Sequence, residues 1–274
     1  MRIHLALSAS QCKNSEDDID EWAMNERERI VAVIPALDEE GNIADVVRGL
    51  LPTVHHVVVA DNGSRDTTRE RARQAGAEVV DVTDRGYGAA CLGGIRKAKE
   101  LSATIVLFLD GDGSDDPSEA DRLLQPVLAH ECDLALGVRK REAIEPGAMT
   151  PVQRFGNWFA PHLMRLVVGA KYTDMPPYKA IRMSSLEALA LSDRHHGFTI
   201  ELLLRAYDEN LRICEVPVSC RARRSGISKV SGNVYGSLRA AGKITWSIAR
   251  YAFKQHAKKK CTSSETDPVI ERTP

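Results

Sequence analysis

Short apolar runs alternate with amphipathic helical patterns along the first half of the chain, and this alternation most constrains the fold. Between the runs, apolar residues recur at helical spacing, as they do over 43–51. Strands that alternate with helices form parallel sheets with helical crossovers. The sequence therefore predicts an α/β fold with a mostly parallel central sheet flanked by helices. The five runs expected to be strands are 30–34, 57–60, 77–82, 105–109 and 133–137.

The alternation changes after residue 137. We expect a polar loop there, and then helices, before one more strand that Pro217 should end. The expected elements are the loop 138–150, helices over 152–168, 184–191 and 199–209, and a strand over 211–216.

Acidic residues follow two of the predicted strands at the point where each strand ends. Asp61 follows the run 57–60, and Asp110, Gly111 and Asp112 follow the run 105–109. Ligands of parallel α/β sheets gather beyond the carboxyl ends of the strands. Two carboxylates so close together need a cation or hydrogen bonds, and Mg²⁺ prefers one or two carboxylates plus substrate phosphates. The pattern favours a metal–diphosphate site over the alternative of two solvated turns.

Composition limits the classes of function. The chain has 274 residues, 43% of them hydrophobic, and its 37 basic and 38 acidic residues give a net charge of −1. This balance argues against a uniformly basic nucleic-acid binder. Charge is uneven, because 16–40 is acidic and 221–260 is basic, which indicates an anionic partner for the C-terminal part.

The six cysteines form no Cys-x-x-Cys pair, so a reduced, cytoplasmic compartment is expected. We find no segment with the roughly 20 apolar residues that cross a bilayer. We interpret 1–28 as a mobile N-terminal extension, 29–230 as the catalytic domain, 231–260 as a basic amphipathic helix and 261–274 as a disordered tail. The amphipathic helix suits either a peripheral contact with the cytosolic membrane face or packing on the domain.

Several motifs, in this order, resemble family 2 glycosyltransferases, and most closely the dolichyl-phosphate mannose and glucose synthase group. The resemblance extends over about 29–250. Its carrying segments are VIPALDEEGNI (33–43), VADNGSRDT (59–67), GYGAA (86–90), LDGDGS (109–114), GVR (137–139), DMPPYKAIR (174–182), GFTIE (197–201), EVPV (215–218) and RRSGISK (223–229).

The resemblance implies a GT-A fold, which is the Rossmann-like fold of nucleotide-diphospho-sugar transferases, and Mg²⁺ or Mn²⁺ as cofactor. It implies donor binding by Pro35, Asp38, Glu39, Asp61, Asp110, Gly111 and Asp112. Asp110 and Asp112 would hold the metal. The implied phosphate or acceptor residues are Arg139, Arg182, Arg223 and Lys229, and the implied catalytic residues are Asp112, Arg139, Arg223 and Lys229.

The first hypothesis for function is a metal-dependent, inverting transfer of a hexose from a UDP- or GDP-sugar to a polyprenyl (dolichyl or undecaprenyl) phosphate. A second keeps the fold and takes a soluble glycan or a small metabolite as acceptor. A third is a non-catalytic protein that binds nucleotide sugars.

Three residues depart from the family pattern: Leu37, where an aromatic residue is usual, Tyr87, where a basic residue is frequent, and Ser114, where a glutamine can help to hold the metal. Arg85 is a candidate substitute for the basic residue that position 87 lacks. Glu201 is interpreted as the polar face of a helix rather than as an acceptor-side base.

Overall fold

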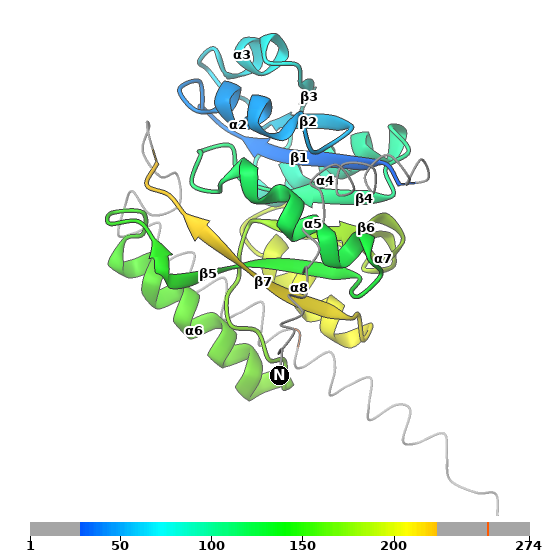
Figure 1. Cartoon of the computed structure of the whole chain (residues 1–274), viewed down its shortest axis with the longest axis vertical. Coiled ribbons are helices and arrows are strands. Elements are labelled where there is room, and N and C mark those ends of the chain that lie inside the picture. Colours follow the sequence, from blue (N-terminus) through cyan, green and yellow to red (C-terminus); the bar gives the residue numbers. More distant parts are fainter. Residues whose placement is uncertain (1–27, 224–250, 252–274) are drawn as a thin grey trace, which may run out of the picture.

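The computed structural model describes residues 28–223 and Tyr251, and its described part forms one seven-stranded sheet with helices on both faces (Figure 1). The strand order is β3-β2-β1-β4-β6-β5-β7. The elements are β1 (Ile30–Ala36), α2 (Ile43–Leu50), β2 (His56–Asp61), α3 (Thr68–Gln74), β3 (Glu78–Asp81), α4 (Tyr87–Glu100), β4 (Ile105–Phe108), η1 (Pro117–Glu119), α5 (Ala120–Leu128), β5 (Leu134–Ile144), α6 (Pro151–Val168), β6 (Lys179–Arg182), α7 (Met183–Ala188), α8 (Phe198–Asp208) and β7 (Ile213–Cys220).

The predicted α/β class is confirmed, and the sheet is mostly parallel. Strands β1 to β4 pair in parallel, and β5 pairs in parallel with β7. Strand β6 lies between β4 and β5 and is antiparallel to both. The carboxyl ends of every parallel strand therefore meet at one edge of the sheet, which is where a ligand site forms in such folds.

Two apolar cores cover the two faces of the sheet. Along β1, Ile30, Ala32 and Ile34 point into the core beneath α2, α3 and α5, whereas Val31 and Val33 point into the core beneath α4, α7 and α8. Both faces of the strand are buried, and this explains why it is a continuous apolar run instead of an alternating one. Helix α6 packs on the second core through Met164.

Two expectations about the second half of the chain were wrong. The expected polar loop 138–150 is extended chain up to Ile144, because β5 continues beside β7 well past Gly137. The last strand runs through Pro217 to Cys220. Strand β7 is the edge of the sheet, and an edge strand tolerates proline because its missing N–H need not pair.

The predicted domain boundaries outside the described residues stay predictions. Residues 1–27 and most of 231–274 lie outside the described part of the chain. Tyr251, from the predicted amphipathic helix, donates a hydrogen bond from its hydroxyl to the Leu204 carbonyl on α8 (3.1 Å). Among the described helices, none is both long and apolar enough to cross a membrane.

Candidate active site

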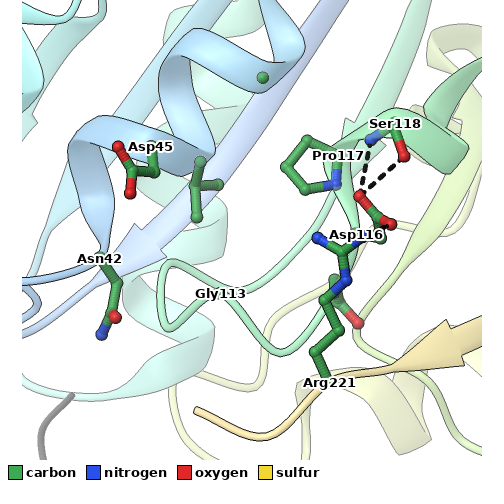
Figure 2. A pocket seen from close by; sticks show the side chains of 10 residues that line it. Asn42, Asp45, Gly113, Asp116, Pro117, Ser118 and Arg221 are labelled. Carbon is green, nitrogen blue, oxygen red and sulfur yellow. Dashed lines mark hydrogen bonds and ion pairs between the residues drawn. The ribbon is translucent and has the colours of Figure 1, made fainter. Parts of the chain in front are cut away.

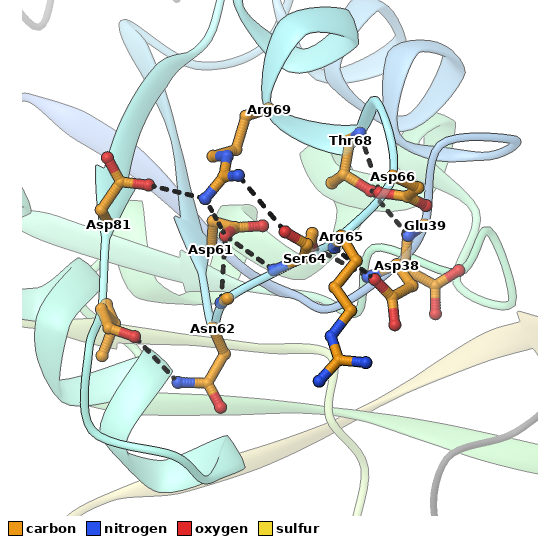
Figure 3. Close-up of polar contacts among 12 residues, drawn as sticks. Asp38, Glu39, Asp61, Asn62, Ser64, Arg65, Asp66, Thr68, Arg69 and Asp81 are labelled. Atoms are coloured by element: carbon orange, nitrogen blue, oxygen red, sulfur yellow. Dashed lines mark hydrogen bonds and ion pairs between the residues drawn. The ribbon is translucent and has the colours of Figure 1, made fainter.

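Asp61 ends β2 with a fully buried side chain (Figure 3). Its Oδ2 accepts hydrogen bonds from the backbone amides of Gly63 and Ser64, both at 3.0 Å. Gly63 has φ +86°, a conformation that suits glycine and allows this tight turn. The other carboxylate oxygen, Oδ1, is buried with no hydrogen-bond partner in the described chain. Because buried acceptors are nearly always paired, Oδ1 is suited to accept from an N–H of a ligand.

The loop after β1 lies beside Asp61, because Ala36 pairs with Asp61 and Pro35 with Ala60. Asp38 accepts from the Arg65 amide (2.8 Å), and Thr68 accepts from the Glu39 amide (2.8 Å). These bonds join the loops that follow β1 and β2. The expected donor residues Pro35, Asp38, Glu39 and Asp61 therefore lie together at the same edge of the sheet.

The loop Asp110–Asp115, called the Asp-loop from here on, follows β4 at the same edge. A side chain at Gly111 would meet Ile34 Cγ2 at 3.2 Å, so glycine lets this loop approach β1 closely. The Asp110 amide donates to Asp115 Oδ2 (3.1 Å), and the Ser114 amide donates to Asp112 Oδ1 (2.9 Å). Both bonds are local to the loop and fix its shape.

The Asp-loop concentrates negative charge. Burial, together with the neighbouring charges of Asp112 and Asp115, raises the pKa of Asp110 to about 8. Burial also raises the pKa of Asp115, to about 6. Asp110 Oδ1 is buried and has no hydrogen-bond partner among the described residues. A divalent cation would relieve this repulsion and complete that oxygen's bonding.

Asp110 and Asp112 fit a Mg²⁺ or Mn²⁺ ion that a substrate diphosphate shares. Within the described residues, no group of three or more His, Cys, Asp or Glu side chains could hold a metal by itself. Mg²⁺ needs only one or two carboxylates when substrate phosphates supply further oxygens. The donor set therefore suits a cation that binds together with its nucleotide.

Arg223 spans the two acidic loops. Its Nη1 donates to Glu39 Oε1 (2.8 Å), and its Nη2 donates to Asp112 Oδ2 (2.5 Å). The end of β7 brings it there, because the Arg221 amide donates to the Ser114 carbonyl (2.8 Å). Arg223 thus places a positive charge beside the proposed metal ligand Asp112.

Arg139 lies at the same edge, on β5. Leu136 and Phe108 both pair with Lys179. Arg139 therefore lies three residues beyond that level along β5, as Gly111 of the Asp-loop does after β4. Its guanidinium makes a two-point ion pair with Asp174, with both N–O distances 2.8 Å. Fixed in this way, Arg139 is a rigid cation on the β5 side of the site.

Lys179 is fully buried near the Asp-loop. Its Nζ donates to the carbonyls of Pro176 (3.3 Å) and Pro177 (3.1 Å) and lies 5.6 Å from the Phe108 ring centroid. Burial lowers the pKa of this lysine, while Asp110 and Asp115 oppose that effect. The roles of Lys179 and Asp174 were not predicted, because only contacts between segments distant in sequence reveal them. Asp115 was interpreted as part of a solvated turn, but its side chain accepts from the Asp110 amide and is buried.

Of the expected phosphate-binding residues, Arg182 is not brought to the site. Arg182 pairs with Ile105, at the amino end of β4, and so lies at the opposite edge of the sheet. There it forms an ion pair with Glu28 (2.9 Å). The expectation for Arg182 was wrong because β6 is antiparallel. Lys229 lies outside the described residues, and its role stays a prediction.

The structure shows where Tyr87, a departure from the family pattern, and Arg85, its candidate substitute, lie. Tyr87 is partly buried and packs against Phe198, with ring centroids 6.3 Å apart, so it does not replace a basic residue at the nucleotide. Arg85 donates to the Asn62 carbonyl (3.1 Å) and lies beside Gly63. Arg85 therefore lies at the turn that follows Asp61, whereas the cation that contacts the Asp61 carboxylate is Arg69, whose Nη1 is 3.4 Å from Oδ2. The role of Arg85 as a substitute for a basic residue at position 87 stays a prediction.

A hollow of about 220 Å³ adjoins the Asp-loop, between α2 and η1 (Figure 2). Asn42, Gly113, Pro117 and Arg221 are among its lining residues. Arg221 is paired there with Asp116. Residues Gly113 and Asp115 of the Asp-loop line the hollow, whereas Asp61 does not.

The geometry defines an α/β protein with an acidic site, suited to a cation, at the carboxyl ends of its strands. The sequence pattern of glycosyl transferase family 2 matches residues 31–190, and the chain belongs to this family. An uncharacterized glycosyltransferase of Mycobacterium tuberculosis is 33% identical over 210 residues, which are 76% of this chain and 93% of that protein.

Two further relatives carry names that state an activity. The undecaprenyl-phosphate mannosyltransferase of Micrococcus luteus is 28% identical over 81% of this chain and 95% of its own length. The polyprenol monophosphomannose synthase of Mycolicibacterium smegmatis is 31% identical over 75% of this chain and 82% of its own. Among solved structures, glucosyl-3-phosphoglycerate synthase of M. tuberculosis superposes with a TM-score of 0.68 at 23% identity, covering 84% of this chain and 82% of that one. That likeness confirms the GT-A-like fold.

Proposed function

We propose that this family 2 glycosyltransferase moves a hexose from a UDP- or GDP-sugar to a polyprenyl phosphate, with inversion and with the help of Mg²⁺ or Mn²⁺. The observation that carries the proposal is the arrangement of charge at one sheet edge. Asp61, Asp110 and Asp112 line one side, and the other side carries Arg139 on β5 and Arg223 just beyond the end of β7. Such a site binds a metal–diphosphate and still has cations for a second phosphate.

The chemistry follows from this division of charge. The acceptor phosphate oxygen forms a bond to the anomeric carbon while that carbon's bond to the nucleotide diphosphate breaks. A metal held by Asp110 and Asp112 would neutralise charge on the departing diphosphate. Arg223 and Arg139 would hold the acceptor phosphate, which is already anionic and needs no general base. In agreement with this, the Glu201 carboxylate does not serve as a base in this proposal, because it accepts hydrogen bonds from the amides of Ser192 (2.9 Å) and Asp193 (2.7 Å).

The acceptor class rests on the two relatives named for polyprenyl-phosphate mannosyl transfer. A soluble phosphorylated metabolite is the competing acceptor, because an arginine clamp recognises any phosphomonoester. The structural relative named glucosyl-3-phosphoglycerate synthase was solved with phosphoglyceric acid. Phosphoglyceric acid is therefore the competing acceptor to test.

Two measurements test the proposal in order. Thermal shift with UDP, GDP and their hexose derivatives, with and without Mn²⁺, identifies a nucleotide that stabilises the protein only with metal. The matching labelled sugar is then incubated with undecaprenyl phosphate or with 3-phosphoglycerate. We expect label in the organic phase. Label only in a water-soluble product would identify a phosphorylated metabolite as the acceptor. If no nucleotide stabilises the protein in a metal-dependent way, both acceptor assignments fail.

A further inference from the structure

Helix α6 exposes a continuous apolar surface, which we call the α6 face. The helix carries four of the six large exposed apolar side chains in the described part of the chain. Phe155 is 58% exposed, Trp158 57% and Leu166 84%. The opposite side of the helix is buried, with Ala160 and Met164 fully covered. Such exposure of aromatic residues on one helix marks an interaction surface.

The four apolar residues of the α6 face, together with His162, lie on one side of the helix. Positions 155, 158, 159, 162 and 166 follow helical spacing. Their rings contact one another, because the centroids of Phe155 and Phe159 are 5.6 Å apart and those of Trp158 and His162 are 4.7 Å apart. The aromatic surface is therefore preformed.

Charge on α6 is of one sign. Its sequence contains Arg154 and Arg165 and no Asp or Glu, and both arginines are exposed. Lys171, just beyond the helix, is also exposed. A helix with an aromatic strip and a basic border fits the interface of an anionic bilayer, where tryptophan rings lie at headgroup level.

A second copy of the chain fits this surface less well. A two-fold interface that paired α6 with itself would bring Arg154 and Arg165 of both copies together, and α6 has no acidic residue to pair them. An anionic lipid surface would both cover the apolar side chains and supply negative charge to the two arginines.

We propose that the α6 face docks the enzyme on an anionic membrane, and this inference rests on the proposed lipid-phosphate acceptor. Helix α6 directly follows β5, the strand that carries Arg139 (Figure 1). Docking through α6 would hold this cation near the headgroups, where a polyprenyl phosphate presents its phosphate. The proposal is distinct from the membrane contact considered for 231–260.

The test uses the full chain and vesicles of phosphatidylcholine, alone or mixed equally with phosphatidylglycerol. The variant is Phe155→Ser with Trp158→Ser, and the matched control is Leu51→Ser, which removes an exposed apolar residue (40%) elsewhere. We expect the double variant to lose roughly tenfold or more of its affinity for the anionic vesicles in flotation, and the control to bind like the parent. Unchanged thermal stabilisation by donor and Mn²⁺ verifies folding.

A second measurement reports on Trp158 itself. With Trp22 and Trp246 replaced by Phe, Trp158 is the remaining tryptophan. Its emission should shift to the blue on anionic vesicles and be quenched by brominated lipid. Unchanged emission, binding that survives the double substitution, or binding that is lost only when Lys258–Lys260 become Gln would each overturn the proposal. A dimer that the double variant dissociates, without vesicle binding by the parent, would assign the face to a second copy.

Activity separates this inference from the proposed function. We expect the double variant to lose transfer to undecaprenyl phosphate in vesicles and to keep transfer to a short, water-soluble prenyl phosphate. Equal loss on both acceptors would assign α6 to the catalytic site and overturn the docking role. If the parent binds vesicles through Trp158 but transfers sugar to neither acceptor, the docking surface stands and the proposed function fails.

Discussion

The two halves of the sheet fix their charged residues in different ways. In the β1–β4 half, carboxylates are held by backbone amides close in sequence: Asp61 by Gly63 and Ser64, and Asp112 by Ser114. In the β5–β7 half, arginines are held by distant carboxylates. Arg139 is 35 residues from Asp174, and Arg223 is 184 residues from Glu39.

This difference separates two tasks. Amides that belong to a tight turn hold a carboxylate rigidly and leave its second oxygen for a ligand, as in Asp61. An arginine held by a remote carboxylate depends on the whole fold being assembled. We therefore expect changes in the acidic half to affect chemistry more than stability, and changes in the Arg139–Asp174 pair to affect stability first.

The largest effect should follow Asp112→Asn. The variant keeps the turn with Ser114 but loses half of the proposed metal ligation, so kcat/KM should fall on the order of 10²–10³-fold. Initial rates with saturating Mn²⁺ measure this, and Asp45→Asn, an exposed carboxylate on α2, is the control. A variant with parental activity would show that Asp112 does not serve the metal.

The next effect concerns stability. Asp174 is buried and Arg139 is largely buried, with side chains 7% and 12% exposed, so Asp174→Asn leaves a largely buried guanidinium without its counter-charge. We expect a loss of about 3 kcal/mol in the free energy of unfolding, measured with denaturant. The double variant Asp174→Leu with Arg139→Met should recover most of that stability and remain inactive. Equal stability of Asp174→Asn and the parent would contradict the comparison.

The same contrast explains what the sequence could predict. Local signals were sufficient for β1, β2 and β4 and for the carboxylates that follow them. They were insufficient for β6, a four-residue strand that includes a buried lysine instead of forming an apolar run. Because β6 is antiparallel, Arg182 lies at the far edge, and a motif alone does not reveal strand direction. Asp174 becomes meaningful only through Arg139.

The variant Arg223→Gln tests the role of an arginine held by distant carboxylates, because Mn²⁺ affinity and turnover should change in opposite directions. Removing a cation beside Asp112 and Glu39 should strengthen Mn²⁺ binding, roughly severalfold. Turnover should fall, roughly 10²-fold, because a phosphate-binding cation is lost. Electron paramagnetic resonance titration of Mn²⁺ and steady-state rates measure the two effects, and Arg221→Gln is the control. Weaker metal binding would show that Arg223 organises the carboxylates instead of competing with the metal.

The smallest effect tests a carboxylate that is held partly by local amides and yet supports a distant element. Glu201 binds the amides of Ser192 and Asp193, and the carbonyls of Arg194 and His195 in that same loop accept from the first amides of α4. Replacing Glu201 with Gln should cost about 1 kcal/mol of unfolding free energy at neutral pH, with Glu187→Gln as the control.

The pH dependence gives this last prediction its sign. Burial opposes ionisation of Glu201, but the two amides and Arg205 outweigh it and lower its pKa below the ordinary 4.5. The ionised group's contribution is therefore complete above about pH 4.5 and is lost as the pH falls through the lower pKa of the folded state. Unfolding curves of parent and variant should converge in that acidic window. A difference that stays constant down to pH 3 would mean that shape, and not the charge of Glu201, holds the loop against α4.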